Sequence, residues 1–409
     1  MKNKEKTIKL LKYVTIGLAI FFLLELIYFG YKMINIRNNS TYYSGINSVI
    51  KTDTGYVAVG FSDKKHSKFL KYEAPGYNKP YIWVYDNDLK IVKEISLDLG
   101  YNGEFNDLLE VLDGYIVVGN IEMSDTNHKD SATEGVIIKY DKDFNIVWRK
   151  NYNALGDTKF NVVKEYKDSY FVGGSSVFES SALGRDEKGG AIILQYNKDG
   201  EKTLEMSHGG ATSYGLFNDI EIVDDGIIAV GVMYKGTGII YKYDFKGKEL
   251  WHNYFGYTDT MGLTSITKIN NNEFVITASK LEGKDKTDNY QAALIKINNK
   301  GNIIKEEYYV KDNISRFNDS VLLDDKLYVV GVYGKKNDSI LDNDSVIVTY
   351  NDSLEKQDEL IYDGNKTYTL TKIINVDSKY VVVGNTNSKL KLDNLKTNGL
   401  DFYQVIDKQ

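Results

Sequence analysis

One phrase of about fifteen residues returns along the chain and constrains the fold more than any other feature. It is clearest in FNDLLEVLDGYIVVG (105–119), FNDIEIVDDGIIAVG (217–231) and FNDSVLLDDKLYVVG (317–331). Aligned on its last small residue, the phrase has seven copies, spaced by 47 to 59 residues. The aligned residues are Gly60, Gly119, Gly174, Gly231, Ala278, Gly331 and Gly384. This spacing indicates an array of similar supersecondary units rather than two or three unrelated domains.

Each unit reads as four short strands. The phrase supplies two apolar runs joined by a turn, and after a variable insert a second pair follows, as in GVIIKYDKDFNIVWRKNY (135–152). The runs are rich in Val, Ile and Tyr and are bounded by polar turn residues, a pattern typical of strands. Within this pair, DKDFN (141–145) lacks the glycine and the distal glutamate of a calcium loop, so we expect a hairpin turn there. Four-stranded units of this period predict an all-β fold, a seven-bladed β-propeller.

The two ends of the array suggest how the propeller closes. The last copy stops after DFYQVIDKQ, a third strand with no fourth. The segment NIRNNSTYY (35–43) stands just before the first copy, where a fourth strand belongs. We therefore expect residues 35–409 to form the propeller, with the N-terminal strand 35–43 pairing with the C-terminal strand 402–406. This closure removes an open sheet edge.

The residues before the propeller predict a membrane anchor. A basic tail with five lysines (1–12) precedes 22 mostly apolar residues (13–34), which are enough to span a bilayer as a helix. The positive-inside rule places the tail in the cytoplasm and the propeller outside the cell. A cleaved signal peptide is the alternative, but no small-x-small cleavage site follows the apolar run 16–24. The sequence thus predicts a single-pass signal anchor in the cell membrane.

Glu25 interrupts this predicted span. An acidic residue near the middle of a membrane helix costs about 3 kcal/mol on insertion scales. Either a partner helix satisfies the carboxyl group, or the helix tilts and lets it reach the headgroups. Of the two interpretations we favour the tilt.

Charge and composition exclude several classes of function. Residues 1–37 contain seven Lys/Arg and two Asp/Glu, so they carry +5, and because the whole chain carries −6 the remainder carries −11. An acidic body argues against nucleic acid as a partner. The chain has no cysteine, which excludes disulfides, thiol catalysis and cysteine-ligated zinc. No phosphate-binding loop or dinucleotide fingerprint occurs, so we expect no cofactor, and the four scattered histidines predict no metal site.

A polar residue stands thirteen positions before each aligned small residue. These candidate site residues are Asn47, Asn106, Asn161, Asn218, Ser265, Asn318 and Thr371. In three copies an aspartate follows, namely Asp107, Asp219 and Asp319. All lie at the start of the innermost strand, so they should ring the mouth of the central channel. They form either a polar or cation-binding funnel or a set of ties to neighbouring backbone groups. Recurrence in nearly every blade favours the ties, because a site usually breaks the symmetry of a repeat.

The inserts indicate which face carries function. The turns between first and second strands and between third and fourth strands are short, whereas long polar inserts such as 62–80 all join second to third strands. The path from the anchor into the propeller puts the short turns towards the membrane and the inserts away from it. Binding residues often lie in such loops, and Tyr72 and Tyr77 are candidate ligand contacts. The three tryptophans lie in strands, where we expect packing between blades.

The repeats, seen in GIIYKYDFKGKELW (238–251) and DGYIVVG (113–119), resemble those of bacterial extracytoplasmic β-propeller proteins with NHL-like or quinoprotein-like blades. The likeness covers residues 35–409. It implies the propeller fold and a range of roles that includes binding scaffolds, assembly factors and some enzymes. The Asp-box of sialidases and the vicinal cysteine pair of many quinoprotein dehydrogenases are absent from this sequence.

These observations lead to one principal hypothesis and two alternatives. The principal one is a membrane-anchored, extracytoplasmic propeller that acts as a binding or scaffold module for a cell-envelope glycan, a peptide or a protein partner. The first alternative is a hydrolase or lyase that uses the acidic residues at the channel mouth, which requires one carboxyl group with a raised pKa. The second is a structural spacer without a small ligand.

Overall fold

The computed structural model describes most of the region after the predicted anchor. The described residues are 44–62, 78–97, 102–123, 132–153, 157–179, 188–208, 215–233, 236–256, 260–282, 289–334, 343–362, 368–377, 379–386 and 402–406. The predicted tail, membrane span and closing strand 35–43 lie outside them, as do Tyr72 and Tyr77. Within these ranges, no helix has the length and apolar character needed to cross a bilayer.

The described chain is built from antiparallel β-strands. The first sixteen are β1 (Ser44–Thr52), β2 (Gly55–Ser62), β3 (Lys79–Asp86), β4 (Ile91–Ser96), β5 (Gly103–Val111), β6 (Gly114–Met123), β7 (Ala132–Asp141), β8 (Ile146–Tyr152), β9 (Thr158–Tyr166), β10 (Ser169–Glu179), β11 (Lys188–Asn197), β12 (Lys202–His208), β13 (Gly215–Val223), β14 (Gly226–Met233), β15 (Thr237–Tyr243) and β16 (Glu249–Phe255). The others are β17 (Met261–Lys268), β18 (Glu273–Glu282), β19 (Asn289–Asn298), β20 (Ile303–Tyr309), β21 (Ile314–Leu323), β22 (Lys326–Gly334), β23 (Asn343–Tyr350), β24 (Lys356–Tyr362), β25 (Tyr368–Val376), β26 (Lys379–Thr386) and β27 (Phe402–Ile406).

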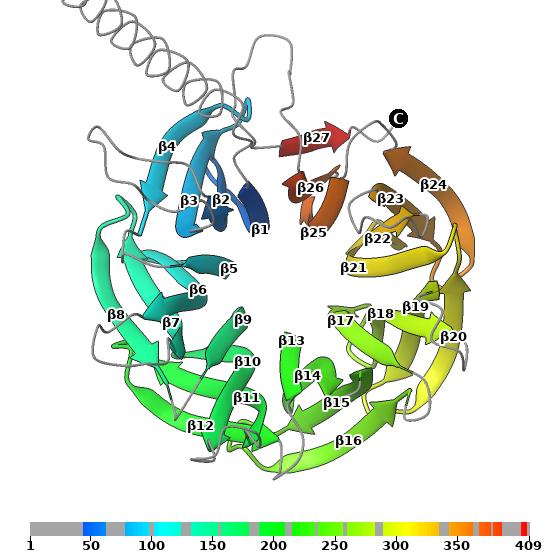
Figure 1. Cartoon of the computed structure of the whole chain (residues 1–409), viewed down its shortest axis with the longest axis horizontal. Helices are drawn as coiled ribbons and strands as arrows, with labels where there is room; N and C mark the ends of the chain where they lie inside the picture. The colour runs from blue at the N-terminus through cyan, green and yellow to red at the C-terminus, as the bar shows by residue number, and fades with distance from the viewer. Residues whose placement is uncertain are drawn as a thin grey trace, which may run out of the picture. The chain divides into compact units, whose positions relative to one another are not determined.

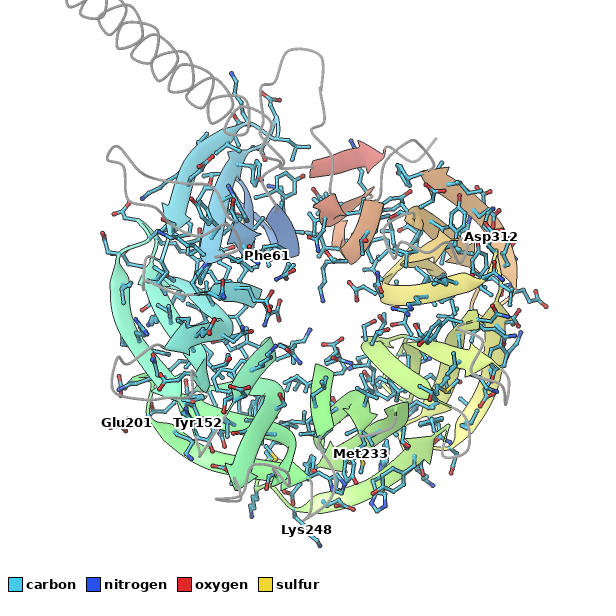
Figure 2. All side chains as sticks on the ribbon, in the orientation of Figure 1. Phe61, Tyr152, Glu201, Met233, Lys248 and Asp312 are labelled. Carbon is cyan, nitrogen blue, oxygen red and sulfur yellow. The ribbon has the colours of Figure 1, made fainter. Side chains whose placement is uncertain are left out.

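Consecutive strands pair into four-stranded blades. The strand order is β5–β6–β7–β8 in one blade and β13–β14–β15–β16 in another, so each strand pairs with its neighbours in the sequence. Figure 1 shows the blades set around a common centre, with the first strand of each blade innermost and the fourth at the perimeter. Tyr152 on β8 and Lys248, in the turn before β16, mark that perimeter in Figure 2. The described strands therefore form a β-propeller, as the sequence predicts.

The recurring phrase is the inner hairpin of a blade. In blade β13–β16, Phe217 pairs with Gly231, and the register then slips by one residue at Asn218, which forms a β-bulge. Phe217 is fully buried in the core. The bulge draws the backbone so close that a Cβ atom on Gly231 would lie 1.9 Å from the carbonyl oxygen of Leu216. The small residue at the end of the phrase thus follows from the bulge at its beginning.

The turns between third and fourth strands are closed by an Asp or Asn side chain. Asp141 Oδ1 accepts hydrogen bonds from the main-chain N–H groups of Asp143 and Asn145, and Phe144 has a φ of 65°. This confirms that DKDFN is a hairpin turn. The same side-chain bonds recur at Asp86, Asn197, Asp244 and Asn298.

The core lies between neighbouring blades rather than inside any one of them. Ile228 and Ile240 of blade β13–β16 pack with Leu263 and Ile276 of the next blade. Between the first and last blades, Trp83 is buried in a cluster that also contains residues of β25 and β26. Contacts of this kind link every innermost strand to the next, from β1 onward and from β25 back to β1.

The last blade contains β25, β26 and β27 among the described strands. β27 pairs antiparallel with β26, so the C-terminal segment provides a third strand, as the sequence predicts. β26 also pairs with β1 of the first blade at two positions, Ser44 with Thr386 and Gly45 with Asn385. The predicted fourth strand, 35–43, lies outside the described residues and stays a prediction.

Candidate functional site

A polar cavity of about 130 Å³ lies at the mouth of the central channel. Two consecutive residues from the innermost strand of each blade line it. They are Asn47 and Ser48, Asn106 and Asp107, Asn161 and Val162, Asn218 and Asp219, Thr264 and Ser265, Asn318 and Asp319, and Thr371 and Lys372. The structure thus brings together, at one cavity, all ten polar residues that the sequence predicts to ring the mouth.

The first residue of each pair, which we call the bulge residue, ties its blade to the next one. Asn218 Nδ2 donates a 2.6 Å hydrogen bond to the carbonyl oxygen of Leu263 in the following blade. The equivalent bonds run from Asn47 to Phe105, Asn106 to Phe160, Asn161 to Phe217, Thr264 to Phe317 and Asn318 to Leu370. Thr371 Oγ1 donates to the carbonyl of Ile46 and so returns the series to the first blade. This agrees with ties to neighbouring backbone groups, the interpretation that recurrence favours.

In the blade that begins with β17, the residue thirteen positions before the aligned small residue is Ser265, which follows the bulge residue. Thr264, not Ser265, makes the bond to the next blade. The reason is the β17–β18 turn, which is one residue longer than in other blades, so that Leu263 pairs with Ala278 across 15 positions whereas Phe217 pairs with Gly231 across 14. Ser265 is the second residue of the pair, and its hydroxyl group hydrogen-bonds to the hydroxyl group of Thr277.

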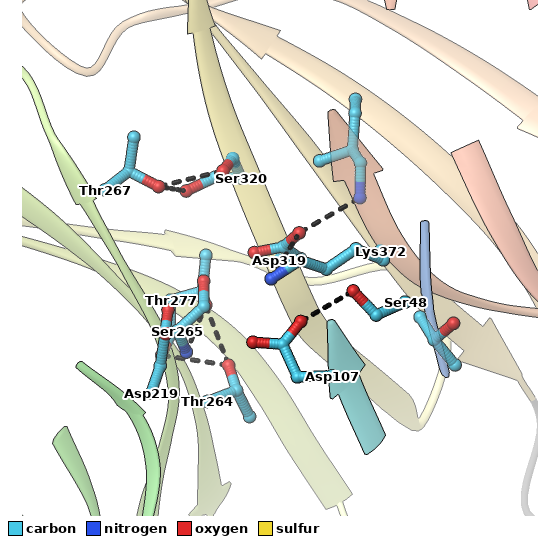
Figure 3. A network of polar contacts seen from close by, with 12 residues as sticks. Ser48, Asp107, Asp219, Thr264, Ser265, Thr267, Thr277, Asp319, Ser320 and Lys372 are labelled. Atoms are coloured by element: carbon cyan, nitrogen blue, oxygen red, sulfur yellow. Dashed lines mark hydrogen bonds and ion pairs between the residues drawn. The ribbon is translucent and has the colours of Figure 1, made fainter. Parts of the chain in front are cut away.

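The three aspartates occupy the second position in alternate blades, and each accepts a main-chain N–H of the next blade. Asp219 Oδ2 accepts from Ile266 over 3.0 Å. Matching bonds of 3.0 Å run from Val163 to Asp107 and from Ile373 to Asp319. The aspartate side chains accept further hydrogen bonds. Asp107 Oδ1, for example, accepts one of 2.7 Å from Ser48 Oγ (Figure 3). The innermost edge of each sheet has no further strand to pair with, so these carboxylates satisfy N–H groups there.

Burial and charge act in opposite directions on the ionisable groups of the mouth. Asp319 is 4% exposed, and burial raises the pKa of its carboxyl group despite Lys372, whose Nζ lies 3.7 Å from Asp319 Oδ2. For Lys372, burial favours a lower pKa, but the carboxylates of Asp319, Asp219 and Asp107 outweigh it and raise the pKa. Lys372 is therefore held as a cation among acids.

Glu221, further along β13, is a fourth acidic group near this cluster. Burial raises the pKa of its carboxyl group, and Lys164 partly opposes that shift. A raised pKa is one property of a catalytic acid, but it also arises wherever a carboxyl group is buried for structural reasons. Within the described ranges, no group of three His, Asp or Glu side chains is placed to hold a metal ion.

The two histidines among the described residues, His208 and His252, do not line the cavity. His208 ends strand β12, and its Nε2 lies 2.5 Å from Tyr241 Oη in the next blade. His252 lies on β16 and pairs with Glu249 over 2.6 Å. His66 and His128 fall outside the described residues.

Two tryptophans join neighbouring blades, as the sequence predicts. Trp148 Nε1 donates to the carbonyl of Lys198, and Trp251 Nε1 donates to the carbonyl of Asn299, each in the turn of the next blade. Both rings pack against the clusters between blades. These contacts agree with packing between blades.

Sequence reasoning overlooked Lys372, Ser48 and Thr264. Aligning the phrase on its first residues instead of its last brings INS, LTS and LTK under FND, which puts Ser48, Ser265 and Lys372 in the column of the aspartates. That column contains both acids and a base. The longer β17–β18 turn displaces only Ser265 from this column, because Ser48 and Lys372 stand twelve positions before Gly60 and Gly384, as Asp107 does before Gly119.

No protein-family model matches the chain, and no curated protein matches it in sequence. In fold it is similar to an ulvan lyase of polysaccharide lyase family PL25, at a TM-score of 0.53 and 10% identity over 84% of this chain and 91% of that one. The same lyase bound to -[GlcA(1-4)Rha3S]- gives a TM-score of 0.52 at the same identity and coverage. The β-propeller domain of the Trilobed protease from Pyrococcus furiosus gives 0.47 at 11% identity, over 84% and 89%. At these identities the likeness is one of fold alone.

Proposed function

We propose that this chain is a single-pass membrane protein whose seven-bladed propeller, residues 35–409, lies outside the cell and acts as a binding or scaffold module. The observation that carries the proposal is the unequal length of the connections. Sixteen residues separate the end of β2 at Ser62 from the start of β3 at Lys79, whereas two separate β1 from β2. The antiparallel order of a blade puts all connections between second and third strands on one face of the propeller. Variable connections on a rigid scaffold are a common way to build a binding surface.

The ligand we propose is a cell-envelope glycan, a peptide or a protein partner, held by these connections around the channel mouth. Tyr72 and Tyr77, in the connection 63–78, are the candidate contacts, because tyrosine offers a large apolar face and a hydroxyl group. The hydrogen bonds of the bulge residues support a count of seven blades. The series has seven donors: it starts at Asn47 and ends at Thr371, which donates to the carbonyl of Ile46 in the first blade.

Catalysis by the acids of the mouth has less support. A general acid or base needs a carboxyl group that can reach the substrate and exchange a proton with it. Asp107, Asp219 and Asp319 are each at most 9% exposed, and each already accepts a main-chain N–H of the neighbouring blade. Their arrangement suits the joining of blades better than it suits turnover.

A thermal-shift experiment tests the binding function. The full-length protein, purified in detergent, is heated with peptidoglycan fragments, envelope polysaccharides, short peptides or divalent cations, because a ligand of the folded state raises the midpoint. We expect one class to raise it by a few degrees. Trimming residues 63–78 to a short turn should abolish the shift, whereas Lys300→Ala, in a short turn of another blade, should preserve it. A shift that survives the trimming contradicts the proposed surface, and no shift with any class contradicts small-ligand binding.

A further inference from the structure

The cavity at the channel mouth gathers negative charge that its lining only partly offsets. Asp107, Asp219 and Asp319 are 9%, 6% and 4% exposed. Among the described residues that line the cavity, Lys372 is the one cation. Three carboxylates and one ammonium group leave a formal charge of −2, and the three aspartates are at most 9% exposed. Charges of one sign repel strongly where water is scarce, so the position of the single cation matters.

The acids and the cation come from different parts of the chain. The three aspartates lie on β5, β13 and β21, whereas Lys372 lies on β25, in the last blade. Lys372 Nζ lies 3.7 Å from Asp319 Oδ2 (Figure 3), and all three carboxylates raise the pKa of this lysine. The cation therefore reaches the acids only when the last blade has taken its place.

The last blade is also where the propeller joins its own beginning. The backbone pairing between β26 and β1 covers two positions. Near the mouth, side chains hold β25 on both sides: Thr371 donates to the carbonyl of Ile46 in the first blade, and Asp319 of the preceding blade accepts the N–H of Ile373. Lys372 stands between these two bonds in sequence and supplies the only charge contact of the set.

We propose that Lys372 is an electrostatic latch for the last blade: seating β25 brings the ammonium group among Asp107, Asp219 and Asp319, and displacing β25 leaves their charges uncompensated. Closure of the propeller and partial compensation of the negative charge at its mouth are thus one event. The latch favours the closed arrangement over one in which the last blade has opened. It does not rest on the proposed binding function.

Hydrogen exchange of the full-length protein in detergent tests the latch. In the Lys372→Met variant, the amides of β25 and β26 should exchange roughly tenfold faster or more, because an acid that has lost its partner destabilises the closed blade. Lys372→Arg keeps the charge and should leave exchange near the original rate. Lys159→Met, which removes an exposed lysine from inner strand β9, is the matched control and should have no effect on β25 or β26.

Two further arms separate a latch from ordinary packing. Adding Asp319→Asn to Lys372→Met should restore most of the lost protection, because the amide oxygen still accepts the N–H of Ile373 while one uncompensated charge disappears. Lowering the pH should also narrow the gap between Lys372→Met and the original protein, as the carboxylates become neutral. The proposal is overturned if β13 and β14 lose as much protection as β25 and β26, if β25 and β26 are unaffected, or if the double variant is no better protected than Lys372→Met alone.

Discussion

The side-chain amide of Asn218 donates a hydrogen bond to the main-chain carbonyl of Leu263, which lies at the bulge of the next blade. The relation repeats around the propeller, with asparagine in five blades and threonine in two. A bulge leaves backbone groups without strand partners, and a buried carbonyl without a donor is costly. The recurring asparagine is therefore explained by assembly of the blades, and a ligand need not be invoked for it.

Removing one of these donors should destabilise the propeller measurably. We expect Asn218→Ala to lower the free energy of unfolding by about 1–2 kcal/mol, because the carbonyl of Leu263 is left without its donor. Asn218→Asp should cost more, since a carboxylate would face that carbonyl. Asn272→Ala, at an exposed turn, is the control. Equal melting temperatures for Asn218→Ala and Asn272→Ala would show that the bond contributes nothing to stability.

A side chain at Gly231, the glycine opposite the bulge of blade β13–β16, should destabilise the propeller. A Cβ atom at position 231 would meet the carbonyl oxygen of Leu216 at 1.9 Å, so the backbone must move to accept Gly231→Ala. We expect a loss of about 1–3 kcal/mol, the usual cost of overpacking. Ala278, which ends the phrase in the blade with the longer turn, provides the comparison through Ala278→Gly. Thermal unfolding of both variants checks this, and an unchanged midpoint for Gly231→Ala would contradict the packing described.

Glu359 should make stability depend on pH in the acidic range. Hydrogen bonds from Lys356 and Lys311 lower the pKa of its carboxyl group to about 2. Because the folded-state pKa is depressed, this contribution is complete above the ordinary value of 4.5 and is lost as the pH falls towards 2. The group is partly exposed, so Glu359→Gln should cost about 1 kcal/mol at neutral pH and nothing near pH 2. Melting curves recorded from neutral pH down to about pH 2 measure this cost. Asp168→Asn, at an exposed turn, serves as the control. A cost that does not change with pH would contradict the assignment.

His208 should add a second acid-sensitive step at a higher pH. Burial lowers the pKa of its imidazole below 6.5, with Glu249 opposing and His252 supporting the shift. The lowered pKa means that the folded state favours neutral His208, whose Nε2 lies 2.5 Å from the hydroxyl oxygen of Tyr241. Its contribution is therefore present above pH 6.5 and is lost as the pH falls below that value.

A substitution at this position isolates that step. The nearby groups that face His208 are Tyr241, Tyr254 and His252, and the hydroxyl of Tyr254 lies 2.7 Å from that of Tyr241. We expect His208→Gln to flatten the stability profile between about pH 5 and 7 while the Glu359 step persists. An unchanged profile in that window would show that another group titrates there.

Much of the fold could be predicted from the sequence because the determinants are local. The pattern Phe-Asn, a turn and a final Gly specifies an inner hairpin with a bulge, and the polar turns of DKDFN type follow from one Asp or Asn side chain. Ser265 lines the cavity as predicted, but the bulge residue of its blade is Thr264, because one extra turn residue shifts the register. Spacing alone does not reveal where a turn absorbs such a residue.

The chemistry of the mouth could be predicted only in part. Asp107, Asp219 and Asp319 stand out in the sequence, but the bonds that they accept come from other blades, and their partners are main-chain groups that no motif marks. Lys372 lies far from Asp107 in the sequence, and only the closed arrangement of blades brings their charges into one cavity. The residue types can be read from the sequence, whereas the compensation of charge between the aspartates and Lys372 depends on the three-dimensional packing.

We propose that the propeller faces outward from an anchored membrane helix, and single-cysteine labelling tests this proposal most directly. The natural chain contains no cysteine, so each introduced thiol is the only one. We predict that a membrane-impermeant maleimide labels the Lys300→Cys variant, at an exposed propeller turn, in intact cells. The Lys4→Cys variant, in the basic tail, should react only after the cells are permeabilised. Labelling of Lys4→Cys in intact cells, or protection of Lys300→Cys until lysis, would contradict the account.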